Sequence, residues 1–382
     1  MKNKKTNISE IFVIVHQSLN NYTFDRFGLN QNLNHKITYL NILPLISKKL
    51  HEKYKKDDFK KENFLNFYSN LSLFKFLIKT PKNSFYTNLT GKNFYSIFID
   101  ILLKFKNFTK FEIVQPSLPL LELKHSKLSS LIRNQKFLLK KINSKIQNLI
   151  INNLYELTSK KAKIIFISND QNIKKIKHNG EVCKINHLDY FNYKKVSHKN
   201  NSGNYFCFID QEQENSFENQ LYHVPYIPNY LQRISEILKT IEFKTGAKAR
   251  VALHHRRNTI PSELKCFECI KDNTISLIKD SKFVLTHNST ALNFAILFKK
   301  PITLIWLKEF ETRLSKYAQM KKLKNEINCD ILDEIQEISN YNFVKNIDDQ
   351  KYESFIKKYI YFNEKIPFEH PWVTIDKKLL KI

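Results

Sequence analysis

Two hydroxyl side chains, Ser289 and Thr290, stand between a short apolar run and a longer apolar segment. The run Phe283–Leu285 predicts a buried strand, and the segment Ala291–Phe298 predicts a helix that begins beside the two hydroxyls. Unpaired backbone N–H groups at a helix start attract anions, so this pair could bind a phosphate group. Ser and Thr are also favoured helix caps, so a role limited to capping stays open at this point.

A second group of side chains that could bind phosphate follows another predicted strand. The apolar stretch Ala249–Leu253 is followed directly by the sequence His-His-Arg-Arg, in which His254 and Arg256 are the candidate ligands. Asp210 likewise follows directly after an earlier predicted strand, at 205–209. A lone cluster of basic residues is commonly a surface feature, so whether it forms a binding site depends on the residues that lie near it.

The second half of the chain alternates predicted strands with predicted helices, which is typical of a doubly wound parallel sheet. The strands are expected at 205–209, 249–253, 283–285 and 302–306, and the helices at 231–245, 274–279 and 291–298. In such sheets, ligands bind beyond the carboxyl ends of the strands. His254, Arg256, Ser289, Thr290 and Asp210 should therefore meet on one rim, which favours a nucleotide-phosphate site there.

The first half of the chain predicts a second α/β unit. Strands are expected at 11–15, 36–43, 111–114, 164–167 and 183–185, and helices at 64–78, 94–108 and 128–160. The polar stretch 194–204 predicts the change of domain, which gives an N-terminal domain at 1–203 and a C-terminal domain at 204–382. The segment after about Ser354 is expected to pack back across the first domain, because Phe355, Tyr359, Ile360 and Phe362 need cover. The predicted fold class is α/β, with two Rossmann-like domains that face a cleft.

Several other kinds of site are disfavoured by the sequence. It has neither a G-x-G-x-x-G motif after a strand nor a G-x-x-x-x-G-K-[ST] motif, and it has no H-E-x-x-H motif or cluster of aspartates. No metal or cofactor is therefore expected. The five cysteines imply no disulfide framework, and Cys266 and Cys269 are interpreted as ordinary helix residues. This cysteine usage fits a reducing cytoplasm.

The charge of the chain is strongly positive but spread along its length. Lys and Arg number 63 against 36 Asp and Glu, a net charge of +27 over 382 residues. Anionic partners are indicated, although richness in Lys, Asn, Ile and Phe is also typical of an AT-rich genome. We do not expect nucleic acid as a partner. No apolar run predicts a membrane span or a signal peptide, so we expect a cytoplasmic protein, with peripheral contact to an anionic membrane left open.

The second half of the chain resembles the C-terminal domain of GT-B-type glycosyltransferases of bacterial surface polysaccharide synthesis, such as capsule and O-antigen enzymes. In sialyltransferase-like members a strand ends in His-Pro and a later helix opens with Ser-Ser or Ser-Thr. The matching residues are His254 and Ser289-Thr290, with FKKPI at 298–302, and His255 stands where the family has Pro. The motifs FDRFGL at 24–29, HLDYFNY at 187–193 and FIDQ at 208–211 also match related surface-carbohydrate proteins.

The resemblance implies transfer of a sugar from a nucleotide-sugar donor, with a CMP-linked sugar as one candidate, to a saccharide or lipid-linked saccharide. His254, Arg256, Ser289 and Thr290 would bind the donor phosphate without a metal. Asp25, Asp189 and Asp210 are the candidates for the catalytic base, and Asp25 and Asp189 could instead only cap turns. Two other functions stay open: a nucleotide-sugar 2-epimerase, and a noncatalytic basic binder of nucleic acid or anionic membrane.

Overall fold

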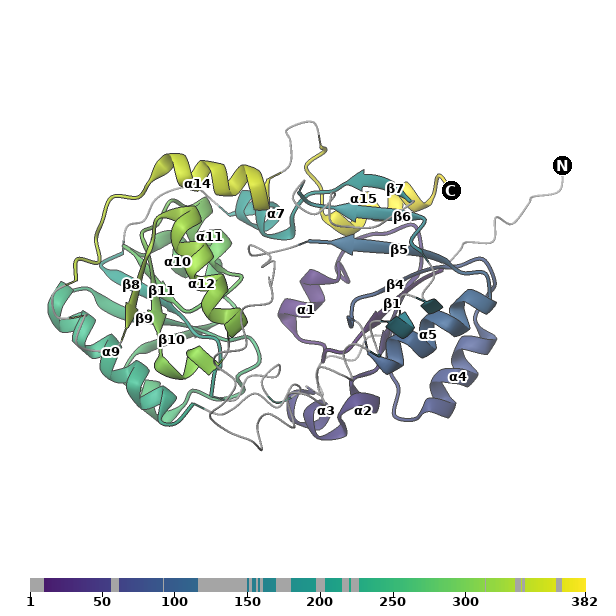
Figure 1. Cartoon of the computed structure of the whole chain (residues 1–382), viewed down its shortest axis with the longest axis horizontal. Coiled ribbons are helices and arrows are strands. Elements are labelled where there is room, and N and C mark those ends of the chain that lie inside the picture. The colour runs from purple at the N-terminus through teal and green to yellow at the C-terminus, as the bar shows by residue number, and fades with distance from the viewer. Residues whose placement is uncertain are drawn as a thin grey trace.

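The chain forms two α/β domains, each built on a parallel sheet, that lie next to each other (Figure 1). The computed structural model describes residues 10–55, 62–91, 93–115, 150, 153–155, 157–158, 161–169, 180–196, 203–214, 220, 227–312, 314–333, 338, 341–361 and 366–382. All strand pairs in the described part of the chain are parallel. The predicted α/β class with two Rossmann-like domains is confirmed.

The first sheet has the strand order β3-β2-β1-β4-β5-β6-β7. Its strands are β1 (Ile11–Val15), β2 (Ile37–Asn41), β3 (Phe64–Asn66), β4 (Phe85–Asn88), β5 (Thr109–Val114), β6 (Ile164–Ile167) and β7 (Glu181–Lys184). Successive side chains of β1 enter two different cores, Ile11 and Val13 on one face of the sheet and Phe12 and Ile14 on the other. A strand that is buried on both faces has to be apolar throughout, which explains the run IFVIV.

The second sheet has the order β10-β9-β8-β11-β12-β13, the same relative order as the first six strands of the first sheet. Its strands are β8 (Tyr205–Ile209), β9 (Lys248–Leu253), β10 (Glu268–Lys271), β11 (Val284–Thr286), β12 (Ile302–Trp306) and β13 (Asp330–Asp333). The order reverses between β8 and β11, and ligands of open α/β sheets bind at such a switch point. The ends of these two central strands therefore position the site described below.

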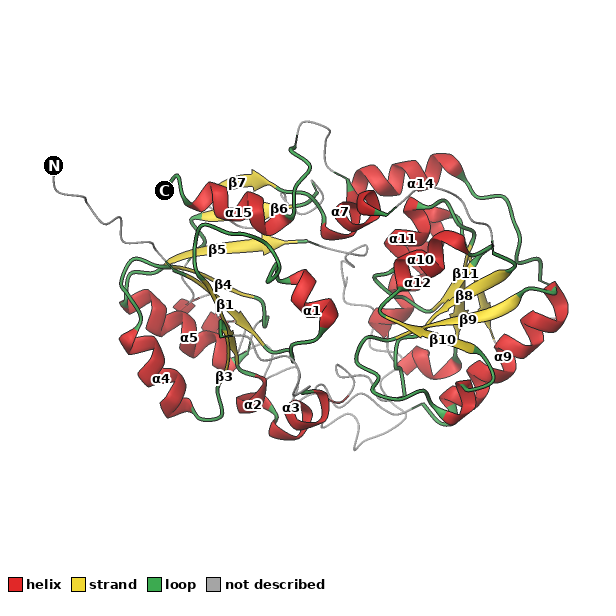
Figure 2. Cartoon of the chain, turned by 180° about the vertical axis from the view of Figure 1, so that it is seen from behind, coloured by secondary structure: helices red, strands yellow, loops and turns green. Residues whose placement is uncertain are grey.

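Helices cover both sheets (Figure 2). In the first domain they are α1 (Asn21–Arg26), α2 (Leu43–Ile46), α3 (Lys48–Tyr54), α4 (Asn70–Lys79) and α5 (Phe94–Phe105). They continue with α7 (Leu188–Lys195), α9 (Tyr230–Thr245), α10 (Thr274–Asp280), α11 (Leu292–Leu297), α12 (Leu314–Ile327), α14 (Asp349–Phe355) and α15 (Pro371–Leu379). Short 3-10 helices span Ser262–Leu264 and Lys308–Thr312. Within the described residues, every helix is too short or too polar to span a lipid bilayer.

The C-terminal segment contacts both domains in turn. Phe355, Tyr359 and Ile360 lie in the core of the second domain, where α14 continues into a π-helix at Ile356–Ile360. Trp372 and Ile375 of α15 then lie in the core of the first domain. The contact with the first domain begins at Tyr359, whose carbonyl oxygen accepts the side-chain N–H of Asn169 at 3.1 Å, and Phe362 lies outside the described residues. The limits of the two domains at 203 and 204 stay a prediction.

Two secondary-structure predictions are wrong. The helix predicted at 64–78 begins only at Asn70, because Ser69 caps it by accepting the backbone N–H of Ser72, and Phe64–Asn66 forms the edge strand β3. Cys269 lies in strand β10 and Cys266 in the turn before it, not in a helix. Both errors come from segments too short for periodicity to separate a strand from a helix. Most of the helix predicted at 128–160 lies outside the described residues.

Candidate active site

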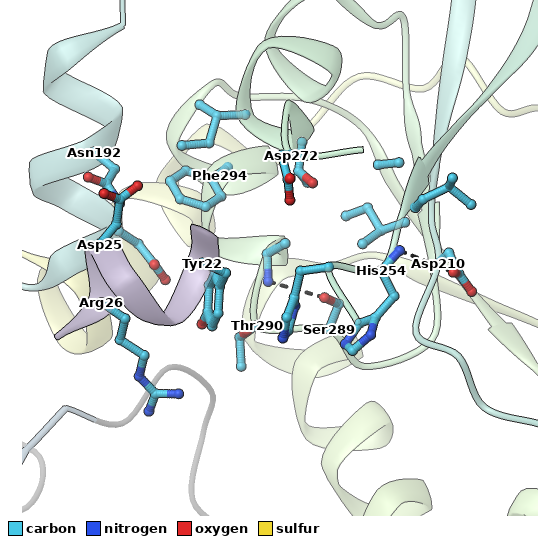
Figure 3. A pocket seen from close by; sticks show the side chains of 18 of the residues that line it. Tyr22, Asp25, Arg26, Asn192, Asp210, His254, Asp272, Ser289, Thr290 and Phe294 are labelled. Atoms are coloured by element: carbon cyan, nitrogen blue, oxygen red, sulfur yellow. Dashed lines mark hydrogen bonds between the residues drawn. The ribbon is translucent and has the colours of Figure 1, made fainter. Parts of the chain in front are cut away.

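A cavity of about 260 Å³ lies between the two domains, at the carboxyl ends of β8, β9 and β11. The first domain contributes α1 and the second contributes the loops before α10 and α11, while α7 lines a further wall. Figure 3 shows α1, with Tyr22, Asp25 and Arg26, on one side of this space and His254, Ser289 and Thr290 on the other, with the Tyr22 ring directed toward Thr290. The lining is Tyr22, Asp25, Arg26, Leu188, Asp189, Asn192, Ile209, Asp210, Ala252, Leu253, His254, His255, Asp272, Thr274, Ile275, Ser289, Thr290, Ala291 and Phe294.

The two hydroxyl residues sit in the turn that leads from β11 into α11. The carbonyl oxygen of Ser289 accepts the backbone N–H of Leu292 at 3.2 Å, and its Oγ accepts the N–H of Ala291 at 3.2 Å. Thr290 is exposed and lines the cavity. The helix begins only at Leu292, with Ala291 as its N-cap and no side-chain capping bond, so neither hydroxyl caps α11 as the sequence suggested. The Ser289 hydroxyl instead closes the turn before the helix, and a hydroxyl that accepts one N–H can still donate its own proton to a ligand.

His254 follows β9 directly and is fixed through its backbone. Its N–H donates to Oδ2 of Asp210 at 3.1 Å, and its Nδ1 lies 3.5 Å from Oε2 of Glu212. The ring packs against the ring of His255, with a centroid distance of 4.3 Å. The carboxylate of Asp210 thus sets where the His254 ring enters the cavity.

Asp210 and Arg257 form a buried ion pair beneath the rim. Arg257 donates from Nη2 to Oδ1 of Asp210 at 3.0 Å and from Nε to Oδ2, and it donates from Nη1 to Oε1 of Glu214 at 2.6 Å. Burial alone would raise the pKa of Asp210, but the hydrogen bonds and charge of Arg257 outweigh it and lower that pKa. Both oxygens of Asp210 are engaged, since Oδ1 also accepts the N–H of Glu212 at 3.0 Å. This arrangement suits a residue that positions others.

Arg256 does not line the cavity, although the sequence favoured it as a phosphate ligand. The neighbouring Arg257, which the sequence analysis did not single out, makes the contacts to Asp210 instead. The only signal for its role was its place in the run of four basic residues after β9, and that run does not show which arginine turns inward. The first domain supplies a different cation, Arg26, which is exposed and lines the cavity.

The other two candidate bases lie on separate walls of the cavity. Asp25 is exposed on α1, and its Oδ1 accepts the side-chain N–H of Asn30 at 2.9 Å. Desolvation raises the pKa of Asp25, and the positive charge of Lys195 opposes that shift. Asp189, in the first turn of α7, accepts the amide of Asn293 at 2.7 Å through Oδ2. The cavity is thus lined by Asp25, Asp189 and Asp210 from three different elements.

Two aromatic rings join the domains at the cavity. Tyr22 of α1 stacks on His255, with a centroid distance of 4.5 Å and an interplanar angle of 24°. Burial lowers the pKa of His255 well below its ordinary value, and the neighbouring His254 and Arg256 act in the same direction. Neither Tyr22 nor the stack was predicted, because nothing in the sequence pairs a residue of the first helix with one after β9.

The described residues hold no group of three or more His, Cys, Asp or Glu side chains that could bind a metal ion. The cavity instead offers imidazole, guanidinium, hydroxyl and carboxylate groups. The first three can bind a phosphate group, and the last can accept a proton from a hydroxyl.

No protein-family profile and no curated protein matches the sequence. Among solved structures, the wall teichoic acid polymerase TagF is similar over 97% of this chain and 89% of its own, with 12% identity and a TM-score of 0.51. A UDP-GlcNAc 2-epimerase from Methanocaldococcus jannaschii is 14% identical over 98% of this chain and 100% of its own, with a TM-score of 0.45. The calicheamicin glycosyltransferase CalG4 is 10% identical over 91% and 93%, with a TM-score of 0.41.

At these identities, the likeness shows the fold alone. The two parallel sheets and the match to TagF identify two Rossmann-like domains facing a cleft, the GT-B-like arrangement that the sequence predicted. The likenesses give no support to the expected link with capsule or O-antigen synthesis or to sialyltransferase-like motifs, and both stay predictions.

Proposed function

We propose that the chain is a glycosyltransferase that binds a nucleotide-activated sugar in the cavity between its domains. The observation that supports this most is the lining itself. His254, Ser289 and Thr290 of the second domain share one cavity with Asp25 and Arg26 of the first. Groups suited to phosphate thus face a carboxylate across a space, as a transfer from donor to acceptor requires.

The donor phosphate would lie against the second domain. The His254 ring and the hydroxyls of Ser289 and Thr290 would donate hydrogen bonds to its oxygens, and Arg26 would add positive charge from across the cavity. Arg256 lies outside the lining, so in this proposal its contribution is smaller than that of Arg26. These groups stabilise the negative charge that develops on the phosphate as the bond to the sugar breaks.

Asp25 is the carboxylate that we assign as base. It is exposed to the cavity, and its raised pKa improves its capacity to accept a proton near neutral pH. Asp210 positions His254 through the bond to its backbone N–H, and Asp189 positions the wall formed by α7 and α11 through Asn293. Asp189 is the alternative base that substitution has to test.

The reaction balances with these groups. Asp25 takes the proton of an acceptor hydroxyl, the hydroxyl oxygen forms a bond to the anomeric carbon, and the bond from that carbon to the phosphate oxygen breaks. The nucleotide leaves with the electron pair and its charge is held by His254 and Arg26. The proposal assigns no step to a metal or cofactor.

The finer identity of the substrates rests on the sequence motifs. The His254 and Ser289-Thr290 pattern resembles sialyltransferase-like enzymes, so a CMP-linked sugar is the first donor to test, followed by UDP-, GDP- and TDP-linked sugars. A saccharide or a lipid-linked saccharide of surface polysaccharide synthesis is the proposed acceptor.

The test measures donor binding and turnover in three variants. Asp25→Asn should lower the transfer rate by roughly a hundredfold to ten-thousandfold while donor affinity stays unchanged. His254→Ala should weaken donor binding by roughly tenfold to a hundredfold, the equivalent of one lost charge-assisted hydrogen bond. Asp189→Asn serves as the matched control for a carboxylate in the same cavity, and a larger rate loss there than in Asp25→Asn would reassign the base.

Two outcomes would overturn the proposal. Isomerisation of the donor in the absence of any acceptor would identify an epimerase, because an epimerase needs no acceptor. Binding that ignores every nucleotide sugar and falls steeply with salt would identify a noncatalytic binder of polyanions.

A further inference from the structure

Helix α5 carries an exposed aromatic stripe on the outer side of the first domain. Phe94, Phe98 and Phe105 follow one another at spacings of four and seven residues, so they share one face of the helix. Their side chains are 59%, 39% and 83% exposed. Core packing accounts for the opposite face, where Ile99 and Leu103 are buried. The exposed stripe is therefore separate from the face by which α5 packs on its sheet.

Helix α4 carries a second stripe of the same kind. Leu71, Phe74 and Ile78 are spaced three and four residues apart, and all three are exposed, Leu71 to 60%. The buried face of α4 holds Leu73 and Leu77, which enter the same core as the buried face of α5. Both helices thus lie on one face of the first sheet with apolar side chains directed away from it.

The two helices are joined at their C-terminal ends. Nζ of Lys106, the residue that follows α5, donates to the carbonyl oxygens of Leu77 at 3.2 Å and Thr80 at 2.7 Å at the end of α4. Figures 1 and 2 show α4 and α5 together at the outer end of the first domain. The C-terminal ends of the two helices therefore lie next to each other, and we call the two stripes together the α4–α5 face.

The charge around this face has a single sign. Lys75, Lys79, Lys82 and Lys104 are exposed on or next to the two helices. The only acidic residue between positions 66 and 107 is Asp100, which is buried and paired with Lys110 at 2.9 Å. Exposed apolar groups flanked by lysines are the composition of helices that lie in a lipid interface.

Helix α9 does not carry an exposed apolar stripe of this kind. Phe243 on α9 is 95% exposed, but it is the only large hydrophobic residue of that helix with high exposure, and Glu236 and Glu242 lie on the same helix. Single exposed apolar residues are common on soluble proteins, whereas contiguous patches mark interaction sites. Phe243 therefore provides a matched control.

We propose that the α4–α5 face docks on an anionic lipid surface, with the aromatic and aliphatic side chains inserted between headgroups and the lysines paired with lipid phosphates. The lipid assignment follows from the absence of exposed carboxylates in this segment, since a second copy of the same face would bring like charges together. Each lysine near an anionic bilayer contributes roughly a fivefold increase in affinity, and the inserted side chains add to it.

The test is cosedimentation of the full chain with vesicles, without any donor or acceptor, so its outcome is independent of the proposed activity. Vesicles of equal parts phosphatidylcholine and phosphatidylglycerol should bind the chain, and vesicles of phosphatidylcholine alone should bind it at least tenfold more weakly. The triple variant Phe94→Ser, Phe98→Ser and Phe105→Ser should lose binding at least tenfold, while Phe243→Ser binds as the parent does.

Charge is tested separately from insertion. The variant Lys75→Gln, Lys79→Gln and Lys104→Gln should weaken binding by roughly a hundredfold, whereas Lys239→Gln on α9 should leave it within roughly twofold. Unchanged thermal unfolding in each variant confirms that the fold is intact. Equal binding to neutral vesicles, loss of binding in the Phe243 control, or a dimer that the triple Phe variant converts to a monomer would each overturn the proposal.

Discussion

The two sides of the cavity are positioned by different kinds of interaction. On the side of the second domain, charge dominates. Arg257 joins the carboxylates of Asp210 and Glu214 beneath the rim, and Asp210 in turn holds the backbone of His254. All of these groups come from within 48 residues of one another and follow neighbouring strands, β8 and β9.

On the side of the first domain, α1 itself is held by neutral hydrogen bonds and packing. His370, which caps α15, has its Nε2 3.2 Å from the carbonyl oxygen of Asp25, and Nε1 of Trp372 donates to the carbonyl oxygen of Arg26 at 3.2 Å. Gly28 has a φ of +65°, and a Cβ there would lie 2.9 Å from Cβ of Trp372. The helix that carries the proposed base is thus held by residues more than 300 positions away in the chain.

The two sides of the cavity should respond differently to substitution and to pH. A buried ion pair is costly to break because the partner that remains is left charged and unsatisfied. A neutral contact between distant segments is weaker, and it depends on the protonation of a histidine. We therefore expect the second-domain side to be sensitive to substitution and the first-domain side to be sensitive to pH.

The largest expected effect is on the buried ion pair. Arg257→Ala leaves Asp210 and Glu214 buried without their cation, and should lower the free energy of unfolding by about 3–5 kcal/mol. Arg256→Ala is the matched control, because Arg256 is adjacent in sequence and only half-buried, and a clearly smaller loss than in Arg257→Ala is expected there. Urea unfolding of both variants measures this, and equal losses would show that the ion pair does not set the second-domain side apart.

The next effect concerns His370 and the attachment of α1. Burial lowers the pKa of His370 to about 4, assisted by the charge of Lys195, while the bond to Asp25 opposes the shift. In the unfolded chain the imidazole titrates near pH 6.5, so between these values the unfolded state binds more protons. Stability should therefore be fully present above about pH 6.5 and fall as the pH drops to about 4, by on the order of 3 kcal/mol.

His370→Asn isolates this contribution. Nδ1 of His370 accepts the N–H of Trp372 at 3.2 Å as a helix cap, and Asn is also a favoured cap that does not titrate. The difference in unfolding free energy between the parent and this variant should change with pH between about 6.5 and 4. A difference that is constant over this range would show that His370 does not titrate with folding.

Much of the second domain could be predicted from its sequence, and the reasons are local. The strands before Asp210, His254 and Ser289 are short apolar runs, and the carboxyl ends of neighbouring parallel strands have to share an edge. The convergence of His254, Ser289 and Thr290 on one cavity follows from that geometry.

The parts that were not predicted depend on tertiary contacts. The sequence does not show that Arg257 turns inward while Arg256 does not, because both follow the same strand. The stack of Tyr22 on His255, and the attachment of α1 to α15, join segments that no periodicity connects. The exposed stripes of α4 and α5 could not be predicted either, since helical spacing does not distinguish a face toward the sheet from a face toward solvent.

The smallest expected effect decides between the two roles of Ser289. If its hydroxyl only accepts the N–H of Ala291 within the turn, Ser289→Ala should cost about 1 kcal/mol of stability and leave donor affinity unchanged. If the hydroxyl also donates to the donor phosphate, affinity should fall by roughly tenfold or more in the same variant. Ser289→Thr keeps a hydroxyl at the position and should restore both properties in part. Melting temperature and nucleotide-sugar affinity are measured together in each variant. A loss of affinity in Ser289→Ala that Ser289→Thr does not reverse would contradict a direct hydrogen bond to the phosphate, because Thr retains the hydroxyl.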